Sequence, residues 1–171
     1  MEEARKGYAR QMARKALKEA CIINPPVDVM VILDIKGYHY IELDTFMDGV
    51  DALFVECDGL IYAAVNANHH LHRQRFSIAH ELGHILLGHN LNYYNEDISL
   101  DNPPSEQRHT ATEKAFETEA NSFAGELLMP LEMLKKEFGK GKNTKDLAKT
   151  FMVSQEVASI AISNHMKSLY K

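Results

Sequence analysis

The segment from residue 73 to residue 88 constrains the fold of this chain more than any other. It reads RQRFSIAHELGHILLG, and its apolar side chains recur at helical spacing before Gly88, a residue type that commonly ends helices. A helix that is apolar on most sides is stable only when other elements surround it. We therefore expect this helix at the centre of the molecule. Its apolar positions are Phe76, Ile78, Ala79, Leu82, Ile85, Leu86 and Leu87.

The residues before this segment predict two helices and three strands. Residues 2–20 have the pattern of an amphipathic helix, which the NPP of residues 24–26 ends. VDVMVIL (27–33) fits a short helix or a strand, and we favour the helix. Residues 38–43, 52–57 and 60–66 have strand character and are separated by turn signals, including the Asp-Gly pair at 58–59. They predict a small, mostly antiparallel three-stranded sheet.

Helical spacing returns after a long polar segment. Residues 90–112 show no periodicity, and loops of this length inside a compact domain tend to be functional or mobile. A helix is then predicted from about Glu113 to Pro130, followed by a short one in PLEMLKKEF (130–138). Together with the small sheet, these helices predict a protein of the α+β class.

The central helix carries the motif H-E-x-x-H, formed by His80, Glu81 and His84. Two histidines four residues apart project from one face of a helix, so both can bind one cation. Glu81 points about 100° away around the helix, toward the place of a metal-bound water. A shuffled sequence with the same nine His and fifteen Glu contains this motif in roughly 4 of 100 cases. The motif therefore needs support from elsewhere in the chain.

A catalytic zinc site needs a third protein ligand, and two glutamates compete for that place. Glu117 and Glu119 lie on the same predicted helix but about 200° apart around it, so they cannot both face one metal. We favour Glu117, because Asn121 follows four residues later on its face and can orient a histidine or the carboxylate. Two histidines and one glutamate suit Zn²⁺, with Mn²⁺ or Fe²⁺ as substitutes.

The segments RQRFSIAHELGHILLGH and ETEANSFAGELLMP together resemble the ImmA/IrrE metallopeptidases, bacterial and phage-borne proteins of the gluzincin type. The similarity extends from about residue 25 to residue 130. It implies a zincin-like domain with His80, His84 and Glu117 as zinc ligands and Glu81 as general base. It also favours Glu117, since the family's glutamate stands three residues before the alanine of the AN pair. Asn121 stands where many such proteins have aspartate.

The resemblance also suggests a function. Proteins of this kind often relieve repression by cleaving a helix-turn-helix repressor that is encoded beside them, on a phage or mobile element, and some relatives act in stress responses. The expectation is thus a zinc-dependent endopeptidase with a nearby repressor as its substrate. Two alternatives stay open: a zinc-containing regulator that binds a repressor without cleaving it, and a DNA-binding regulator that uses the C-terminal segment.

Substrate contacts are harder to predict. In zincins the strand before the active-site helix commonly lies at the edge of the cleft and pairs with the substrate backbone, which here would be LIYAAVN (60–66), with residues 90–112 as a lid. Tyr93, Tyr94 and His109 are candidates for stabilising the oxyanion. Five other histidines are expected to be surface or capping residues; they are His69, His70, His72, His89 and His109.

The C-terminal residues predict a small second unit, so we expect a peptidase domain over 1–138 and a helical segment over 139–171. DLAKTFMVSQEVASIAISNH has the spacing of a helix-turn-helix, with Ser154 capping the second helix. Residues 140–171 contain six Lys against Asp146 and Glu156, but the second helix has no Arg. Direct DNA binding is therefore possible but not favoured. The expected packing residues are Leu147, Ala148, Phe151, Val153, Ala158 and Ile162.

The composition narrows the setting of the protein. The net charge of −5 provides no broad attraction to nucleic acid or to an anionic membrane. Cys21 and Cys57 are too few and too far apart for a disulfide framework. The N-terminal residues have no apolar signal segment, and the longest apolar run is too short to cross a bilayer. These features predict a cytoplasmic protein.

Overall fold

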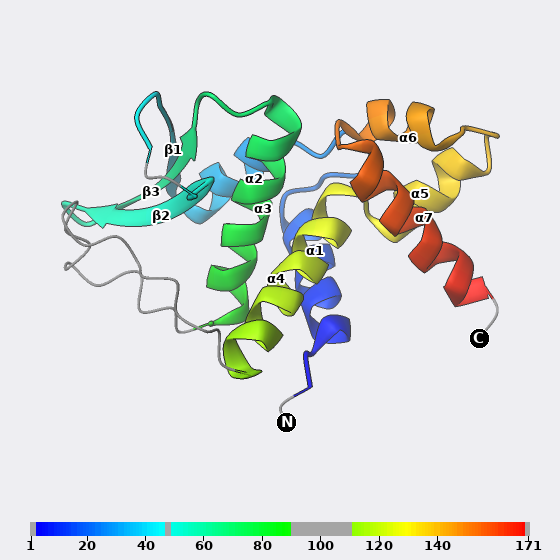
Figure 1. The fold of residues 1–171 in the computed structure, drawn as a ribbon, viewed down its shortest axis with the longest axis horizontal. Coiled ribbons are helices and arrows are strands. Elements are labelled where there is room, and N and C mark those ends of the chain that lie inside the picture. The colour runs from blue at the N-terminus through cyan, green and yellow to red at the C-terminus, as the bar shows by residue number, and fades with distance from the viewer. Residues whose placement is uncertain (1–2, 47–48, 90–110, 170–171) are drawn as a thin grey trace.

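The computed structural model describes residues 3–46, 49–89 and 111–169, which form an α+β fold of a three-stranded sheet and surrounding helices (Figure 1). The sheet lies at one end, α5–α7 lie at the other, and α1, α3 and α4 pack side by side between them. The elements in chain order are α1 (Lys6–Glu19), α2 (Val29–Lys36), β1 (Tyr38–Leu43), β2 (Ala52–Cys57), β3 (Leu60–Asn66), α3 (Leu71–Leu87), α4 (Ala111–Leu128), α5 (Leu131–Phe138), α6 (Thr144–Phe151) and α7 (Gln155–Leu169).

The sheet is mixed, which corrects the expectation of a mostly antiparallel one. Its strand order is β1-β3-β2, with β3 antiparallel to β2 and parallel to β1. The Asp-Gly turn joins β2 to β3 as predicted, and both Asp58 and Gly59 have the positive φ that such two-residue turns require. β1 pairs with the other side of β3 and runs opposite to β2, so it is parallel to β3.

This strand order also contradicts the expected role of LIYAAVN at the cleft edge. β3 is the central strand, and its backbone groups are hydrogen bonded to β1 on one side and to β2 on the other. It has no free edge to offer a substrate. The free edges belong to β1 and β2, and α3 packs against β2 and β3.

The VDVMVIL segment forms a helix, as favoured, because both of its ends are capped. The Asp28 side chain accepts a hydrogen bond from the backbone N–H of Met30 at 3.0 Å. Gly37 ends the helix in the left-handed conformation with a φ of 74°. The chain then turns directly into β1, which packs against α2, and α2 in turn contacts α3.

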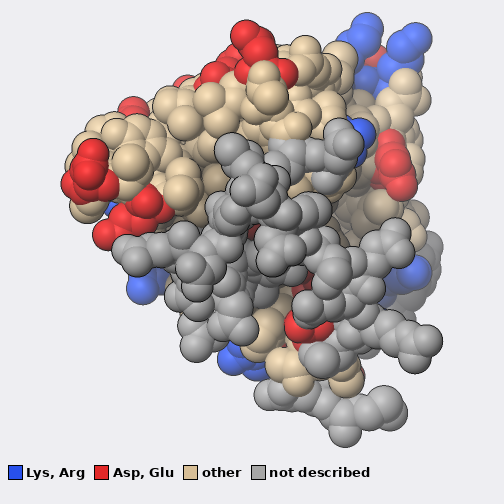
Figure 2. All heavy atoms as spheres, turned by 60° about the vertical axis from the view of Figure 1, so that its left-hand side comes forward, with Lys and Arg blue, Asp and Glu red and all other residues tan. Residues whose placement is uncertain are grey.

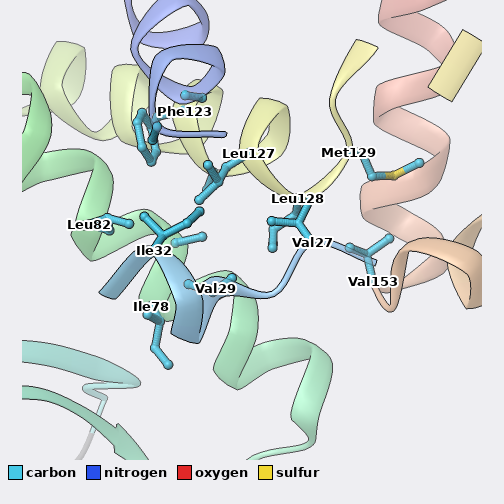
Figure 3. Close-up of a cluster of buried hydrophobic side chains, with 14 of the residues drawn as sticks. Val27, Val29, Ile32, Ile78, Leu82, Phe123, Leu127, Leu128, Met129 and Val153 are labelled. Carbon is cyan, nitrogen blue, oxygen red and sulfur yellow. The ribbon is translucent and has the colours of Figure 1, made fainter. Parts of the chain in front are cut away.

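The hydrophobic core surrounds α3, as its apolar pattern predicts (Figure 3). Ile78 and Leu82 of α3 are both almost fully buried, and Leu82 lies on the side of Ile32 of α2 and Phe123 of α4. Burying side chains of this size stabilises a fold by about 1.5–3 kcal/mol each. The residues that complete this part of the core are Val27, Val29, Ile32, Phe123, Leu127, Leu128, Met129 and Val153.

The C-terminal helices share this core. α6 and α7 are joined by three residues, and the hydroxyl of Ser154 accepts a hydrogen bond from the N–H of Val157 at 3.1 Å, which confirms the predicted cap. The guanidinium of Arg75 on α3 bonds the carbonyl oxygens of Met152 (3.2 Å) and Val27 (2.7 Å), so it ties the turn between α6 and α7 to the centre. A boundary between residues 138 and 139 stays a prediction. Of the predicted packing residues, all are buried except the half-buried Ile162.

Within the described ranges, none of the helices combines the length and the apolar character that a bilayer span requires. On the face shown in Figure 2, Asp and Glu form several separate groups, and Lys and Arg are scattered between them and at the margins. This face therefore carries no broad basic surface among the residues that are described.

Candidate metal centre

His80 and His84 project from α3 toward Glu117 of α4, so that three ligand atoms from two helices meet. The Nε2 atoms of the two histidines are 3.0 Å apart. Glu117 Oε2 lies 3.2 Å from His80 Nε2, and Glu117 Oε1 lies 3.3 Å from His84 Nε2. Among the residues described, these three form a group whose ligand atoms all lie within 4.8 Å of one another. They could hold a metal ion.

The spacing of these atoms fits a tetrahedral ion. Ligand atoms at about 2.0–2.2 Å from a tetrahedral zinc lie roughly 3.3–3.6 Å from one another. The observed separations of 3.0 to 3.3 Å are only slightly shorter. Two imidazole nitrogens and one carboxylate oxygen are also a ligand set that catalytic zinc sites use, with the fourth position open to water or substrate.

The two helices approach closely because Gly83 has no side chain. A Cβ atom at this position would lie 3.0–3.2 Å from three side-chain atoms of Phe123 on α4. Such contacts are tighter than ordinary van der Waals packing, so a larger residue would push α4 away from α3. The neighbour that leaves no room for a side chain at Gly83 is Phe123. This contact brings Glu117 within reach of the two histidines.

Asn121 lies beside His80. Its Oδ1 is 3.1 Å from His80 Nδ1, so it can accept the Nδ1–H hydrogen and leave Nε2 as the nitrogen that binds a metal. Glu119 faces away from this centre and binds Arg5 and His89 instead. The two glutamates of α4 thus point in different directions, as their spacing on the helix predicts.

His89 is not the surface or capping residue that the sequence predicts. It is 5% exposed, and its Nδ1 lies 3.0 Å from Nδ1 of His84. The end of α3 explains its position: Gly88 adopts the left-handed conformation, its N–H bonds Ile85 O, and the N–H of His89 bonds His84 O at 3.0 Å. In this Schellman type of helix end, the residue after the glycine contacts the side chain five positions earlier. A glycine that ends a helix, followed here by His89, is the sequence signal that could have predicted this contact.

The two histidines just before α3, His69 and His70, are closer to the predicted surface and capping positions. His70 caps the N-terminus of α3, since its Nδ1 accepts from the N–H of His72 at 3.2 Å. His69 lies 3.4 Å from the Asp51 carboxylate. Tyr93, Tyr94, His109 and nearly all of the predicted lid fall outside the described residues.

The charges of the three ligand residues stabilise one another. Hydrogen bonds from His80 and His84 lower the pKa of Glu117 far below its usual value, against the opposing effect of burial. Burial lowers the pKa of His80, but the hydrogen bond to Glu117 and the charges of Glu81 and Glu117 outweigh burial and raise it. A cation bound at the centre would stabilise the Glu117 carboxylate in place of the histidine protons.

Glu81 lies within electrostatic range of both histidines and of Glu117. Burial raises the pKa of its carboxyl group, and the charge of Glu117 raises it further, although the two histidines act in the opposite direction. A carboxylate with a raised pKa beside a metal centre is suited to accept and return a proton near neutral pH.

A cavity of about 790 Å³ extends from beside the metal centre to the C-terminal helix. Phe76 and Asn121, which flank His80, form one part of its lining. Apolar residues of α7, including Val157 and Ile160, form another part. Basic side chains of α1 also line it; they are Lys6, Arg10 and Arg14.

Comparisons with known proteins found one family and one similar fold among the matches described below. A sequence model of the peptidase M78 family, described as the IrrE N-terminal-like domain, matches residues 63–163. A solved structure of a Mycobacterium tuberculosis transcriptional regulator is similar in fold, with a TM-score of 0.63 and 16% sequence identity. The similarity covers 89% of this chain but 45% of that one, so this chain spans less than half of the regulator. No curated protein matches this chain.

Proposed function

Because the chain belongs to the peptidase M78 family of IrrE N-terminal-like domains, we propose that it is a zinc-dependent endopeptidase. The observation that carries this proposal is the convergence of His80, His84 and Glu117 within 4.8 Å. These residues would hold the ion, and Mn²⁺ or Fe²⁺ could replace zinc. Asn121 would orient His80 through the contact to Nδ1.

The chemistry that follows is hydrolysis of a peptide bond. A zinc ion bound there would supply a Lewis acid and lower the pKa of a bound water from 15.7 toward about 7. Glu81 would accept the proton of the attacking water and then deliver it to the leaving amine. The raised pKa of the Glu81 carboxyl group supports this role, because the proton can be both taken up and returned.

The substrate we propose is a helix-turn-helix repressor encoded beside this chain, so that cleavage derepresses phage, mobile-element or stress genes. The sequence resemblance to ImmA/IrrE proteins supports this choice. The solved structure titled a transcriptional regulator is compatible with a role in regulation, although its likeness at 16% identity concerns the fold.

A substrate segment has two places to bind near the centre. The free edge of β2, the edge strand that packs against α3, could pair with an extended backbone. The cavity between α1, α4 and α7 could take side chains on the other side of His80. We propose that the C-terminal helices contribute to substrate binding through this cavity, while keeping their place in the core.

Co-incubation with the neighbouring repressor tests the proposed activity. The wild-type protein with zinc should produce repressor fragments, and Glu81→Gln should reduce the rate by about 10²–10⁴-fold while still binding zinc. Fragments that form equally fast with the variant would exclude this mechanism. A stable complex without fragments would instead support a regulator that binds without cleaving. A salt-dependent shift of operator DNA by this chain alone would support DNA binding.

A further inference from the structure

A chain of buried contacts leads from His84 to the beginning of α1. His84 Nδ1 lies 3.0 Å from His89 Nδ1, and His89 Nε2 lies 3.1 Å from Glu119 Oε2. Glu119 accepts three hydrogen bonds from Arg5, from the backbone N–H at 2.7 Å and from the guanidinium at 2.9 and 3.0 Å. Three of the four residues are almost fully buried: His84 is 1% exposed, Glu119 2% and His89 5%.

The donors and acceptors in this chain can be arranged in only one way when both histidines are neutral. An ionised carboxylate only accepts, so the ring nitrogen of His89 that faces Glu119 must carry a hydrogen. A neutral imidazole has a single N–H, and therefore Nδ1 of His89 is an acceptor. It then takes the hydrogen of His84 Nδ1. This leaves the lone pair of His84 Nε2 for a metal ion, which would take the place of the hydrogen that this nitrogen otherwise donates to Glu117.

Two packing contacts fix the position of this chain. Phe116, one residue before Glu117, stacks on the ring of His89 at 4.3 Å between centroids with 13° between the planes. Arg5 is held at the N-terminus of α1, where its side chain also lies 5.4 Å over the ring of Tyr8. The ring of His89 cannot rotate freely between these neighbours, so the hydrogen bond to His84 keeps its direction.

We propose that His89 and Glu119 are positioning residues, which hold His84 in the tautomer and orientation that bind the metal, with Arg5 anchoring Glu119. This inference rests on the proposed metal centre but not on peptide cleavage. A partner that accepts the hydrogen of a ligating histidine fixes its tautomer and raises its basicity as a ligand. In this protein the partner is a histidine, and the carboxylate lies one step further away.

Substitution of His89 tests the proposal, with zinc affinity measured by competition against a chromophoric chelator. His89→Phe keeps the ring but removes both nitrogens, and it should weaken zinc binding by about 10–100-fold. His89→Gln can accept from His84 through its carbonyl oxygen and donate to Glu119 through its amide, so it should recover most of the affinity. His39→Phe, an exposed histidine on β1, is the matched control and should bind zinc as the wild type does.

A second measurement reads the tautomer directly. Nitrogen-15 NMR of the zinc-bound wild-type protein should show His84 with hydrogen on Nδ1 and His89 with hydrogen on Nε2. Equal zinc affinities for wild type and His89→Phe, or a His84 ring with hydrogen on Nε2, would overturn the positioning role. If His89→Phe does not fold, the tautomer of the wild type decides alone. If the wild type binds no zinc, it is the proposed metal centre that fails.

Discussion

The two histidine ligands look equivalent in the sequence, yet the two sides of the metal centre are built differently. On the open side, Asn121 is exposed and contacts His80, and the cavity begins beside them. On the buried side, His84 contacts His89, which leads through Glu119 to Arg5. Water can replace a polar partner on the open side, whereas a lost partner on the buried side leaves an unsatisfied group. We therefore expect the loss of a hydrogen-bonding partner to reduce zinc affinity more on the buried side than on the open side.

The two glutamates of α4 should show the largest contrast. Glu117→Gln removes a charged ligand atom, so zinc affinity should fall by more than the roughly 100-fold that marks the upper range for residues outside the ligand set. Glu119→Gln keeps a carbonyl oxygen that can accept from His89, and its loss should stay below about 10-fold. Isothermal titration of the metal-free proteins with zinc measures both. Equal losses of zinc affinity would contradict the assignment of Glu117 as a metal ligand and of Glu119 as a supporting residue.

Gly83→Ala should disturb both sides together, because the approach of α3 to α4 serves both. The added Cβ would meet Phe123 at 3.0–3.2 Å, and overpacking of this kind costs about 1–3 kcal/mol in the free energy of unfolding. Zinc affinity should fall as well. Gly125→Ala is the control, since a Cβ there meets no atom within 4 Å and alanine favours a helix by about 1 kcal/mol. Urea unfolding that ranks the two variants equally would contradict this account of the close approach.

Asn121→Ala should have a smaller effect than His89→Phe. Asn121 is exposed, and water can accept the Nδ1 hydrogen of His80 when the amide is removed. We expect zinc affinity to fall by less than about 10-fold, below the range for a supporting residue that is buried. Chelator competition on the two variants side by side makes the measurement. A larger loss for Asn121→Ala would reverse the comparison.

Acid should lower the free energy of unfolding by protonating Glu119, which lies on the buried side of the metal centre. Burial opposes ionisation of this carboxyl group, but the bonds from Arg5 and His89 outweigh burial and lower its pKa to about 2. Its unfolded value is about 4.3, so its stabilising effect is complete above that pH and disappears as the pH falls toward 2. Urea unfolding of the metal-free protein between pH 5 and 2 should show a shallower decline for Glu119→Gln. The stabilising role of ionised Glu119 would be contradicted if the free energy of unfolding of Glu119→Gln fell with pH as steeply as that of the exposed control Glu156→Gln.

The sequence predicted those parts of the fold that depend on local periodicity. The apolar pattern of residues 73–88 predicted a central helix, and the Asp-Gly pair predicted the turn between β2 and β3. The position of β1 could not be predicted in the same way, because parallel pairing joins segments that are distant in the chain and leaves no turn signal. For that reason the sheet was expected to be mostly antiparallel, and β3 was wrongly expected at an edge.

The candidate site also has a part that local spacing predicts and a part that depends on residues distant in the chain. The positions of His80, His84 and Glu117 follow from spacing within two helices, so their convergence could be anticipated. His89 was missed because its role depends on a helix end and on Glu119 and Arg5, which lie 30 and 84 residues away in the chain. Gly88 predicts the end of the helix, but the pattern alone does not show that the next side chain, His89, lies against His84.

The central claim is that one ion binds where α3 meets α4. Diffraction from zinc-soaked crystals, measured on both sides of the zinc absorption edge, tests it most directly. The account predicts a single anomalous peak about 2.0–2.2 Å from Nε2 of His80, Nε2 of His84 and a carboxylate oxygen of Glu117. A peak elsewhere, or His84 turned so that Nδ1 faces the ion, would contradict it.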